Sequence, residues 1–229
     1  MNTNIKTLFF LTVLSINLFA QKELPKNNSN YDNQKYHFGF TLGLSHNKLQ
    51  INYSSQFIEQ NIYQKILSKY EPGFNVGIIM DIKIKQNYNL RITPSFNFTD
   101  QKLYYTSNSQ ETTQPSNSGI SNFELPIYLK YRSDRINNGR AYILLGSNII
   151  FDMGGIEELA ENRNLEFSKT NYSIDLGFGV DIYFEFFKFS PEIKYSYGLK
   201  NVLIAQNNKY DSPIEGLTTR GLLFSLTFE

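Results

Sequence analysis

The chain of 229 residues contains no cysteine and only two histidines. The absence of cysteine excludes disulfides, thiol catalysis and zinc–thiolate sites. Its formal net charge is +1, so no excess of one sign indicates a nucleic-acid partner or a strongly acidic one. The mean hydropathy is −0.37, and beyond the extreme N-terminus no apolar run is long enough for a membrane-spanning helix. These absences exclude a helical membrane protein.

What the sequence contains instead is aromatic residues, which make up 15% of the chain, and segments that alternate between polar and apolar positions. Such alternation predicts strands, because successive side chains of a strand point to opposite faces. Each segment has about the ten residues that a tilted strand needs to cross a bilayer. The eight segments are 36–45, 73–83, 90–99, 123–132, 140–152, 171–184, 189–199 and 219–228.

The connections between these segments alternate strictly between short and long. The short ones read "IKQNYN", "SDRINNG" and "EFFK", and the long ones cover about 46–72, 100–122, 153–170 and 200–218. An up-and-down barrel places all short turns at one rim, as outer-membrane barrels do with their periplasmic turns. The sequence therefore predicts an all-β, eight-stranded antiparallel transmembrane β-barrel over residues 36–229, with long extracellular loops.

Glycines decide which face of the strands lies inside. Because glycine weakens strands, it is useful mainly where space is short, as inside a barrel of about eight strands. The alternative is a secreted soluble barrel with an apolar interior. The glycines of the polar face are Gly39, Gly43, Gly77, Gly177, Gly179 and Gly198. The charges assigned to that interior are nearly balanced, with Asp81, Glu124, Asp152, Asp175, Asp181 and Glu192 against Lys83, Arg91, Lys130, Arg132 and Lys194.

Aromatic residues gather near the short turns, as in the girdles of membrane barrels. The apolar face of the strands is then the face that points toward lipid. The last strand, "LLFSLTFE", alternates to its end, but Glu229 follows Phe228 where such barrels usually finish on an aromatic residue. The predicted girdle consists of Tyr36, Phe38, Tyr88, Tyr131, Phe184, Phe186, Phe187, Phe189 and Phe228.

The first residues predict export. One lysine precedes the apolar stretch 7–19, and Ala20 before Gln21 offers a cleavage point, as in a secretory signal peptide. Residues 21–35 are polar, rich in asparagine and without periodicity. We therefore expect a signal peptide over 1–20, a flexible periplasmic tail over 21–35, and a mature chain in the outer membrane of a Gram-negative cell with its N-terminus in the periplasm.

Few residues suggest chemistry. His37 is expected inside the barrel, and His46 at the extracellular end could pair with Ser45 or a loop serine as a hydrolase site. An interfacial or loop histidine is the simpler interpretation. No cofactor-binding, metal-binding or paired-carboxylate motif stands out, so no catalytic residue is assigned. A charged interior argues against a porin, and the stretch 61–70 predicts either a short helix or a flexible loop.

Five stretches resemble the PorT family, also called SprT. They read "YHFGFTLGL" (36–44), "PGFNVGI" (72–78), "RINNGRAY" (135–142), "YFEFFKFSPEIKYSYGL" (183–199) and "SLTFE" (225–229). The resemblance runs in register from residue 36 to 229, and the 183–199 segment is its most specific part. It implies an outer-membrane component of the type IX secretion system without enzymatic activity.

Three functional hypotheses follow. The resemblance implies a non-enzymatic barrel that contacts lipid and other translocon subunits, and no nucleic acid or small-molecule substrate. The second hypothesis is a stand-alone small barrel for adhesion or envelope integrity. The third is an outer-membrane hydrolase that depends on His46.

Overall fold

The computed structural model describes residues 25–55, 57, 63–107, 110–153, 165–206 and 208–229, apart from the side chains of 110–121. The expected signal peptide, residues 1–20, lies outside this part of the chain. Within it, no helix is both long and apolar enough to cross a membrane. The barrel strands are β1 (Tyr36–Tyr53), β3 (Glu71–Lys85), β4 (Tyr88–Ile92), β5 (Ser95–Ser107), β6 (Gln110–Arg132), β7 (Gly139–Asp152), β9 (Thr170–Tyr183), β10 (Lys188–Gly198) and β12 (Ile214–Phe228).

The strands close into an antiparallel ring, because β1 pairs with both β12 and β3. Chain neighbours pair around the rest of the ring, and β4 and β5 share one position between β3 and β6. The break between β4 and β5 falls at Pro94, which has no N–H to donate to the hydrogen bonds between strands. Its carbonyl still accepts a 3.0 Å bond from the Ile78 amide. The predicted eight-stranded up-and-down barrel is confirmed.

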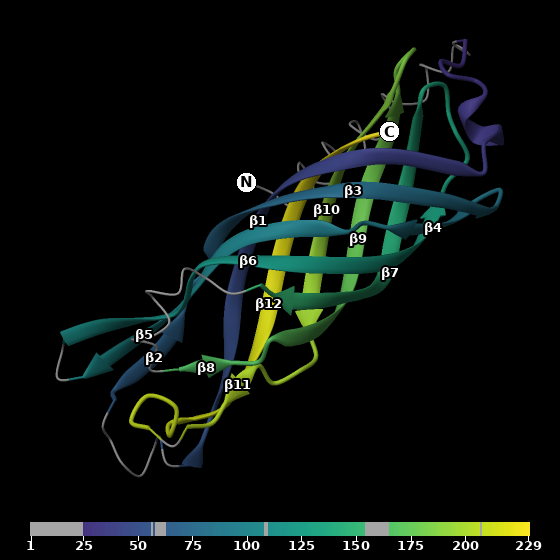
Figure 1. The fold of residues 1–229 in the computed structure, drawn as a ribbon. Coiled ribbons are helices and arrows are strands. Elements are labelled where there is room, and N and C mark those ends of the chain that lie inside the picture. The colour runs from purple at the N-terminus through teal and green to yellow at the C-terminus, as the bar shows by residue number, and fades with distance from the viewer. Residues whose placement is uncertain (1–24, 56, 58–62, 108–109, 154–164, 207) are drawn as a thin grey trace, which may run out of the picture.

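The two ends of the barrel differ (Figure 1). The turns β3–β4, β6–β7 and β9–β10 lie at one end, together with the purple N-terminal segment that carries the 3-10 helix η2 (Tyr31–Asn33). The opposite end carries β2 (Lys65–Ser68), β8 (Glu166–Phe167), β11 (Leu203–Ile204) and the adjoining ends of β5 and β6. Since short turns of outer-membrane barrels face the periplasm, we call the first end the periplasmic rim.

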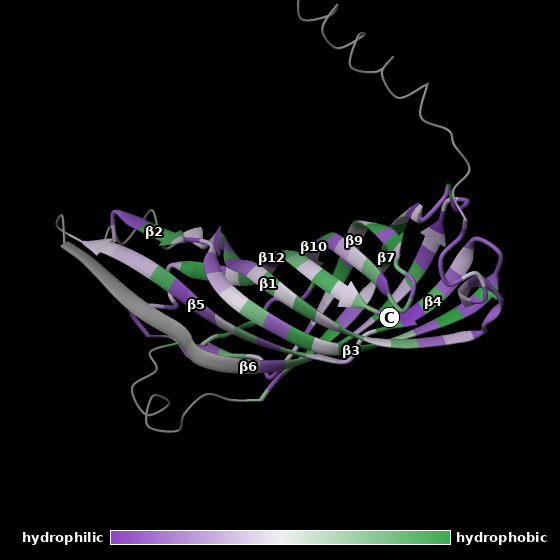
Figure 2. Cartoon of the chain, turned by 90° about the horizontal axis from the view of Figure 1, so that it is seen from above, coloured by the Kyte–Doolittle hydropathy of each residue, from purple (hydrophilic) through white to green (hydrophobic). Residues whose placement is uncertain are grey.

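The polar face of the strands lies inside, as predicted. Bands of opposite hydropathy alternate along the strands that Figure 2 colours, such as β1 and β12. In β9, Ser173 and Asp175 are buried, whereas Leu176 and Phe178 are 58% and 50% exposed. The six predicted glycines all face inward, and a Cβ on each would meet atoms of a neighbouring strand. The exposed apolar wall therefore matches a lipid-facing surface.

Two expectations about the extracellular side are wrong. The stretch predicted as a long loop over 100–122 is a hairpin, because β5 and β6 continue to pair as far as Ser107 and Gln110. Of the stretch predicted as a helix or flexible loop over 61–70, residues 61–62 lie outside the described part of the chain, and the remainder contains β2, which pairs with β5 at Lys65–Ser68. The outer strand of this hairpin offers unpaired backbone groups to β2, and a short helix could not satisfy them.

Above the membrane zone the barrel interior changes from polar to apolar. Strand β1 continues to Tyr53 with the same alternation of inward and outward side chains. Leu49 and Ile51 therefore point inward, as Thr41 and Ser45 do nearer the periplasmic rim. Extracellular segments can bury an apolar inside because water, not lipid, surrounds them. This core comprises Leu49, Ile51, Ile66, Leu103, Tyr105, Leu165, Val202, Ile214 and Leu217.

Gly179 shows how tightly the lumen is packed. A Cβ there would overlap the Tyr142 ring, whose hydroxyl donates to the Glu192 carboxylate at 2.6 Å. We expect Gly179→Ala to lower the free energy of unfolding by about 1–3 kcal/mol, because overpacking displaces that ring. Gly139→Ala is the control, since the nearest atom to its added Cβ is the Ile136 carbonyl at 3.8 Å. Urea unfolding of the vesicle-inserted barrel measures both, and equal midpoints would contradict the tight packing.

Candidate functional site

The periplasmic half of the lumen is filled by a charge network centred on Arg91. This side chain is 1% exposed and forms ion pairs with Asp81 at 2.8 Å, with Glu229 at 2.8 Å and with Glu192. The three acids come from β3, from the residue after β12, and from β10. One guanidinium therefore ties together distant walls of the barrel.

Three lysines complete the network. Lys130 lies 3.1 Å from Asp181, Lys188 lies 2.9 Å from Glu229, and Lys194 lies 3.0 Å from Glu192. All are buried, and charges at such depth must be paired, because an unpaired one costs several kcal/mol. The network contains four cations, Arg91, Lys130, Lys188 and Lys194, and four acids, Asp81, Asp181, Glu192 and Glu229.

Glu229, which follows the last aromatic residue of β12, belongs to the charge network. Its backbone pairs with Lys188 in both directions, at 2.7 and 3.0 Å, which turns its side chain into the lumen. Burial alone would raise the pKa of this carboxyl, but Lys188 and Arg91 outweigh burial and lower the pKa below its ordinary value. Phe228 stays on the outer face, where it stacks on Phe40 at 4.9 Å.

Tyr31 covers the network from the periplasmic side. The sequence predicts a flexible tail over 21–35, and the structure packs residues 25–35 against the rim. The Tyr31 ring stacks on His37 at 3.8 Å, and its hydroxyl donates to Glu229 and accepts from Lys188 at 2.8 and 2.7 Å. Burial raises the pKa of this phenol well above its ordinary value. The side chain is 5% exposed and closes the periplasmic mouth.

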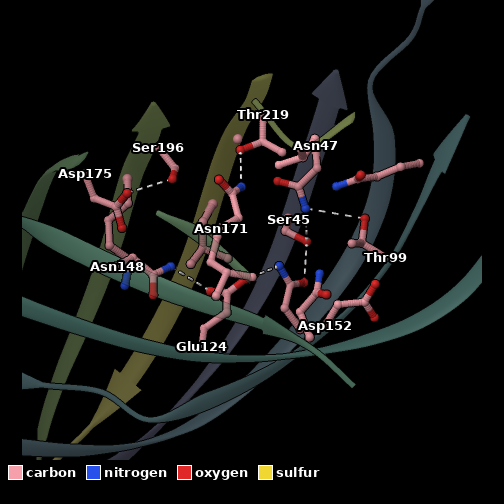
Figure 3. A pocket seen from close by; sticks show the side chains of 18 of the residues that line it. Ser45, Asn47, Thr99, Glu124, Asn148, Asp152, Asn171, Asp175, Ser196 and Thr219 are labelled. Carbon is pink, nitrogen blue, oxygen red and sulfur yellow. Dashed lines mark hydrogen bonds between the residues drawn. The ribbon is translucent and has the colours of Figure 1, made fainter. Parts of the chain in front are cut away.

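A polar cavity of about 90 Å³ lies between the charge network and the apolar extracellular core. Figure 3 shows its Asn, Ser, Thr and carboxylate side chains converging from several strands. Glu124 accepts bonds from Asn97 and Asn148 at 2.8 and 3.2 Å, and Asp175 accepts from Tyr128 at 2.8 Å. A cavity of this size and polarity suits a few water molecules and not an acyl chain.

The geometry does not bring His46 together with Ser45, the first of the two hydrolase partners considered from the sequence; pairing with a loop serine stays a prediction. Ser45 is buried and donates to Asn97 at 2.9 Å, whereas His46 follows it in β1 and is exposed on the opposite face. His37 lies inside the barrel, as predicted, and packs on Tyr31. In the described part of the chain, no group of three or more His, Asp or Glu residues could hold a metal ion.

The predicted aromatic girdle lies around the periplasmic rim. Tyr88 and Tyr131 are adjacent at 5.1 Å, Phe184 and Phe187 stack at 4.9 Å, and Phe186 is 91% exposed. Aromatic rings at this height occupy the interface between lipid and water. The outer wall is therefore a surface for membrane lipid.

Several inward charges were missed by the sequence reasoning. The sequence predicts Lys188 in a turn, but this residue begins β10. It shares the phase of Ser190 and Glu192, and this alternation could have revealed that its side chain points inward. Arg140 likewise shares the phase of Tyr142 in β7. Glu229 likewise shares the phase of the buried Ser225 and Thr227, and its backbone pairing with Lys188 continues that alternation past β12.

We expect Arg91→Met to lower the free energy of unfolding by about 3–5 kcal/mol, because three buried acids lose their shared cation. Lys102→Met is the control, since Lys102 is 30% exposed and pairs with Asp100 at 3.2 Å. Such a surface pair contributes about 0–1 kcal/mol. Urea unfolding of the vesicle-inserted protein measures both changes. A similar small loss for the two variants would mean that the network does not hold the strands together.

The closed lumen predicts the absence of channel activity. In planar lipid bilayers we expect no stepwise conductance from the full chain, and none from Tyr31→Ala, because the charge network beneath this ring still fills the barrel. Regular openings of either protein would contradict a sealed interior.

A family profile agrees with this architecture. The profile of the outer membrane protein beta-barrel domain family matches residues 19–203. No curated protein sequence matches the chain. Similar solved structures include Neisserial surface protein A, with 12% identity, coverage of 85% of this chain and 98% of that one, and a TM-score of 0.46.

Two further solved structures are similar to the barrel. OprG from Pseudomonas aeruginosa is 9% identical, with 85% of this chain and 93% of that chain covered and a TM-score of 0.49. Ail, the attachment invasion locus protein of Yersinia pestis, is 13% identical, with 85% and 98% covered and a TM-score of 0.38. On the family match, which spans most of its length, this chain belongs to the outer membrane protein beta-barrel domain family and is a barrel of the Gram-negative outer membrane.

Proposed function

We propose that this barrel is a non-enzymatic component of the type IX secretion system, required for transport of proteins across the outer membrane. It acts by contact with other translocon subunits, through the periplasmic rim and the adjoining aromatic wall. The resemblance of the sequence to the PorT family is the reason for proposing the type IX pathway. The arrangement of the resembling segments in the fold supports the rim as the contact surface.

The observation that carries the proposal is the position of those segments in the fold. "RINNGRAY" forms the β6–β7 turn and the start of β7, and "YFEFFKFSPEIKYSYGL" contains the β9–β10 turn. "YHFGFTLGL" begins β1 at the same rim, and "SLTFE" ends there. Four of the five stretches thus meet at the periplasmic rim, and "PGFNVGI" alone begins at the other end of β3. Residues that serve a shared contact are expected to gather in this way.

The sealed lumen supports a contact role over a transport path. Buried ion pairs fill the barrel, and apolar side chains close its extracellular end. Exported protein would have to pass through another subunit. What remains available to partners is the rim, where Ile136 is 70% exposed and Phe186 is 91% exposed. Exposed apolar side chains at a rim are typical of protein or membrane contacts.

A stand-alone barrel for adhesion or envelope integrity is the second candidate. The β5–β6 hairpin and its partner β2 favour it, because they extend an ordered surface on the extracellular side. Leu67 and Tyr70 are exposed there, at 36% and 49%. This function would depend on extracellular residues and not on the rim.

Exchange of the β6–β7 turn tests the first proposal. We expect replacement of residues 135–138 by a generic serine–glycine turn to abolish secretion of type IX cargo, because the contact surface is lost. Barrel assembly should continue, since the strands keep their pairing. Secretion is measured by quantifying cargo in culture medium, and assembly by the protein content of the outer membrane.

The control is the extracellular pair Leu67→Ser with Tyr70→Ser, which the first proposal expects to leave secretion unchanged. Normal secretion with the exchanged turn would show that the turn is not the contact. Lost adhesion with the extracellular pair, together with normal secretion in a deletion strain, would support the stand-alone barrel.

A further inference from the structure

The periplasmic rim contains a pocket of about 580 Å³ with a strong excess of positive charge. It lies between the N-terminal segment and the β3–β4 and β6–β7 turns. Its charged side chains are six cations, Lys26, Lys83, Lys85, Arg132, Arg135 and Arg140, and two carboxylates, Asp32 and Asp134.

Three guanidiniums converge on the single carboxylate of Asp32. Its oxygens lie 3.0 Å from Arg140, 3.7 Å from Arg135 and 3.9 Å from Arg132. Asp134 accepts a 3.2 Å bond from Asn87 instead. One negative charge cannot neutralise three arginines, so the pocket retains capacity for further anions.

The arginine side chains of the pocket are held in place, but not all of their N–H donors have a hydrogen-bond acceptor. Arg132 is 2% exposed and Arg140 is 9% exposed, yet the Nε atom of each is buried without a hydrogen-bond acceptor in the described part of the chain. Arg135 is fixed by its stacking over Tyr183 at 3.8 Å. Buried guanidinium donors normally have partners, and their planar fork suits a carboxylate that binds two of them at once.

The rim also binds the backbone of the N-terminal segment that contains Asp32. Asn138 accepts from the Asn27 amide at 2.9 Å and donates to the Pro25 carbonyl at 3.2 Å, while Arg135 donates to the Asn27 carbonyl. Further along, the Lys83 amide donates to the Lys35 carbonyl at 2.8 Å. These are contacts to a peptide, and a phospholipid headgroup would use none of the backbone bonds.

We propose that this pocket is a docking site for an acidic peptide segment of a periplasmic protein, and that Asp32 is the chain's own occupant of it. The Asp32 side chain is 32% exposed, so a competing carboxylate can reach the arginines as the N-terminal segment is displaced. The inference does not depend on the secretion role, because any periplasmic protein could present such a segment.

The test uses the full chain in phosphatidylcholine nanodiscs, with a fluorescent hexa-aspartate peptide as the probe and a hexa-asparagine peptide as its reference. We expect Asp32→Asn to tighten aspartate-peptide binding by about tenfold, since the site is no longer occupied from within. Asp134→Asn is the matched control: it removes the same charge from the same pocket but frees no arginine, and its affinity should stay near that of the unaltered chain.

In the Asp32→Asn background, either Arg140→Gln or Arg135→Gln should weaken binding at least about tenfold, because a charged hydrogen-bond partner is lost. Two arginine variants keep the test usable if one fails to fold, which circular dichroism reports. Equal affinities of the Asp32→Asn and Asp134→Asn variants would overturn the proposal, as would equal binding of the asparagine peptide. In phosphatidylglycerol nanodiscs the anionic surface repels the peptide from every variant alike, so the readout there is the difference between Asp32→Asn and Asp134→Asn. Loss of that difference in phosphatidylglycerol but not in phosphatidylcholine would assign the pocket to a lipid headgroup instead.

Discussion

The rest of the structure depends on the pairing of buried charges across a narrow lumen. Eight strands leave room only for side chains that touch those of the opposite wall. Arg91 meets Asp81, Glu192 and Glu229 there, although 138 positions separate it from the last of them. Because each charge needs its partner, the network fixes the register of the walls. Glycines such as Gly179 make the space in which the larger side chains meet.

This constraint explains why the molecule is layered along its axis. The basic rim comes first, followed by the charge network, the polar cavity and the apolar extracellular core. The interior changes from polar to apolar where the outer surface leaves lipid. A wall surrounded by lipid encloses polar side chains, whereas a wall surrounded by water encloses apolar ones. The layers close the lumen, so a function for the barrel has to reside on its rims and its outer wall.

The strand pattern and the glycines were sufficient to predict the barrel, its polar interior and its aromatic girdle, because side-chain alternation reports directly on the two faces of a strand. The extracellular core could not be predicted from them. Leu49 and Leu217 lie where the strands were expected to have ended, and their role depends on the hairpin that covers them. Tyr31 was missed because its segment has no periodicity, and only the barrel mouth gives it a place. The arginine pocket is likewise assembled by distant segments, since Asp32 and Arg140 meet only in the folded chain.

The central claim is that this sealed barrel works by protein contact at its periplasmic rim. The most direct measurement is photo-crosslinking in living cells from position 136, which is 70% exposed on the β6–β7 turn, compared with position 70, which is 49% exposed on the extracellular side. The account predicts that position 136 crosslinks to a protein of the secretion machinery and that position 70 does not. Protein crosslinks from position 70 alone would contradict it.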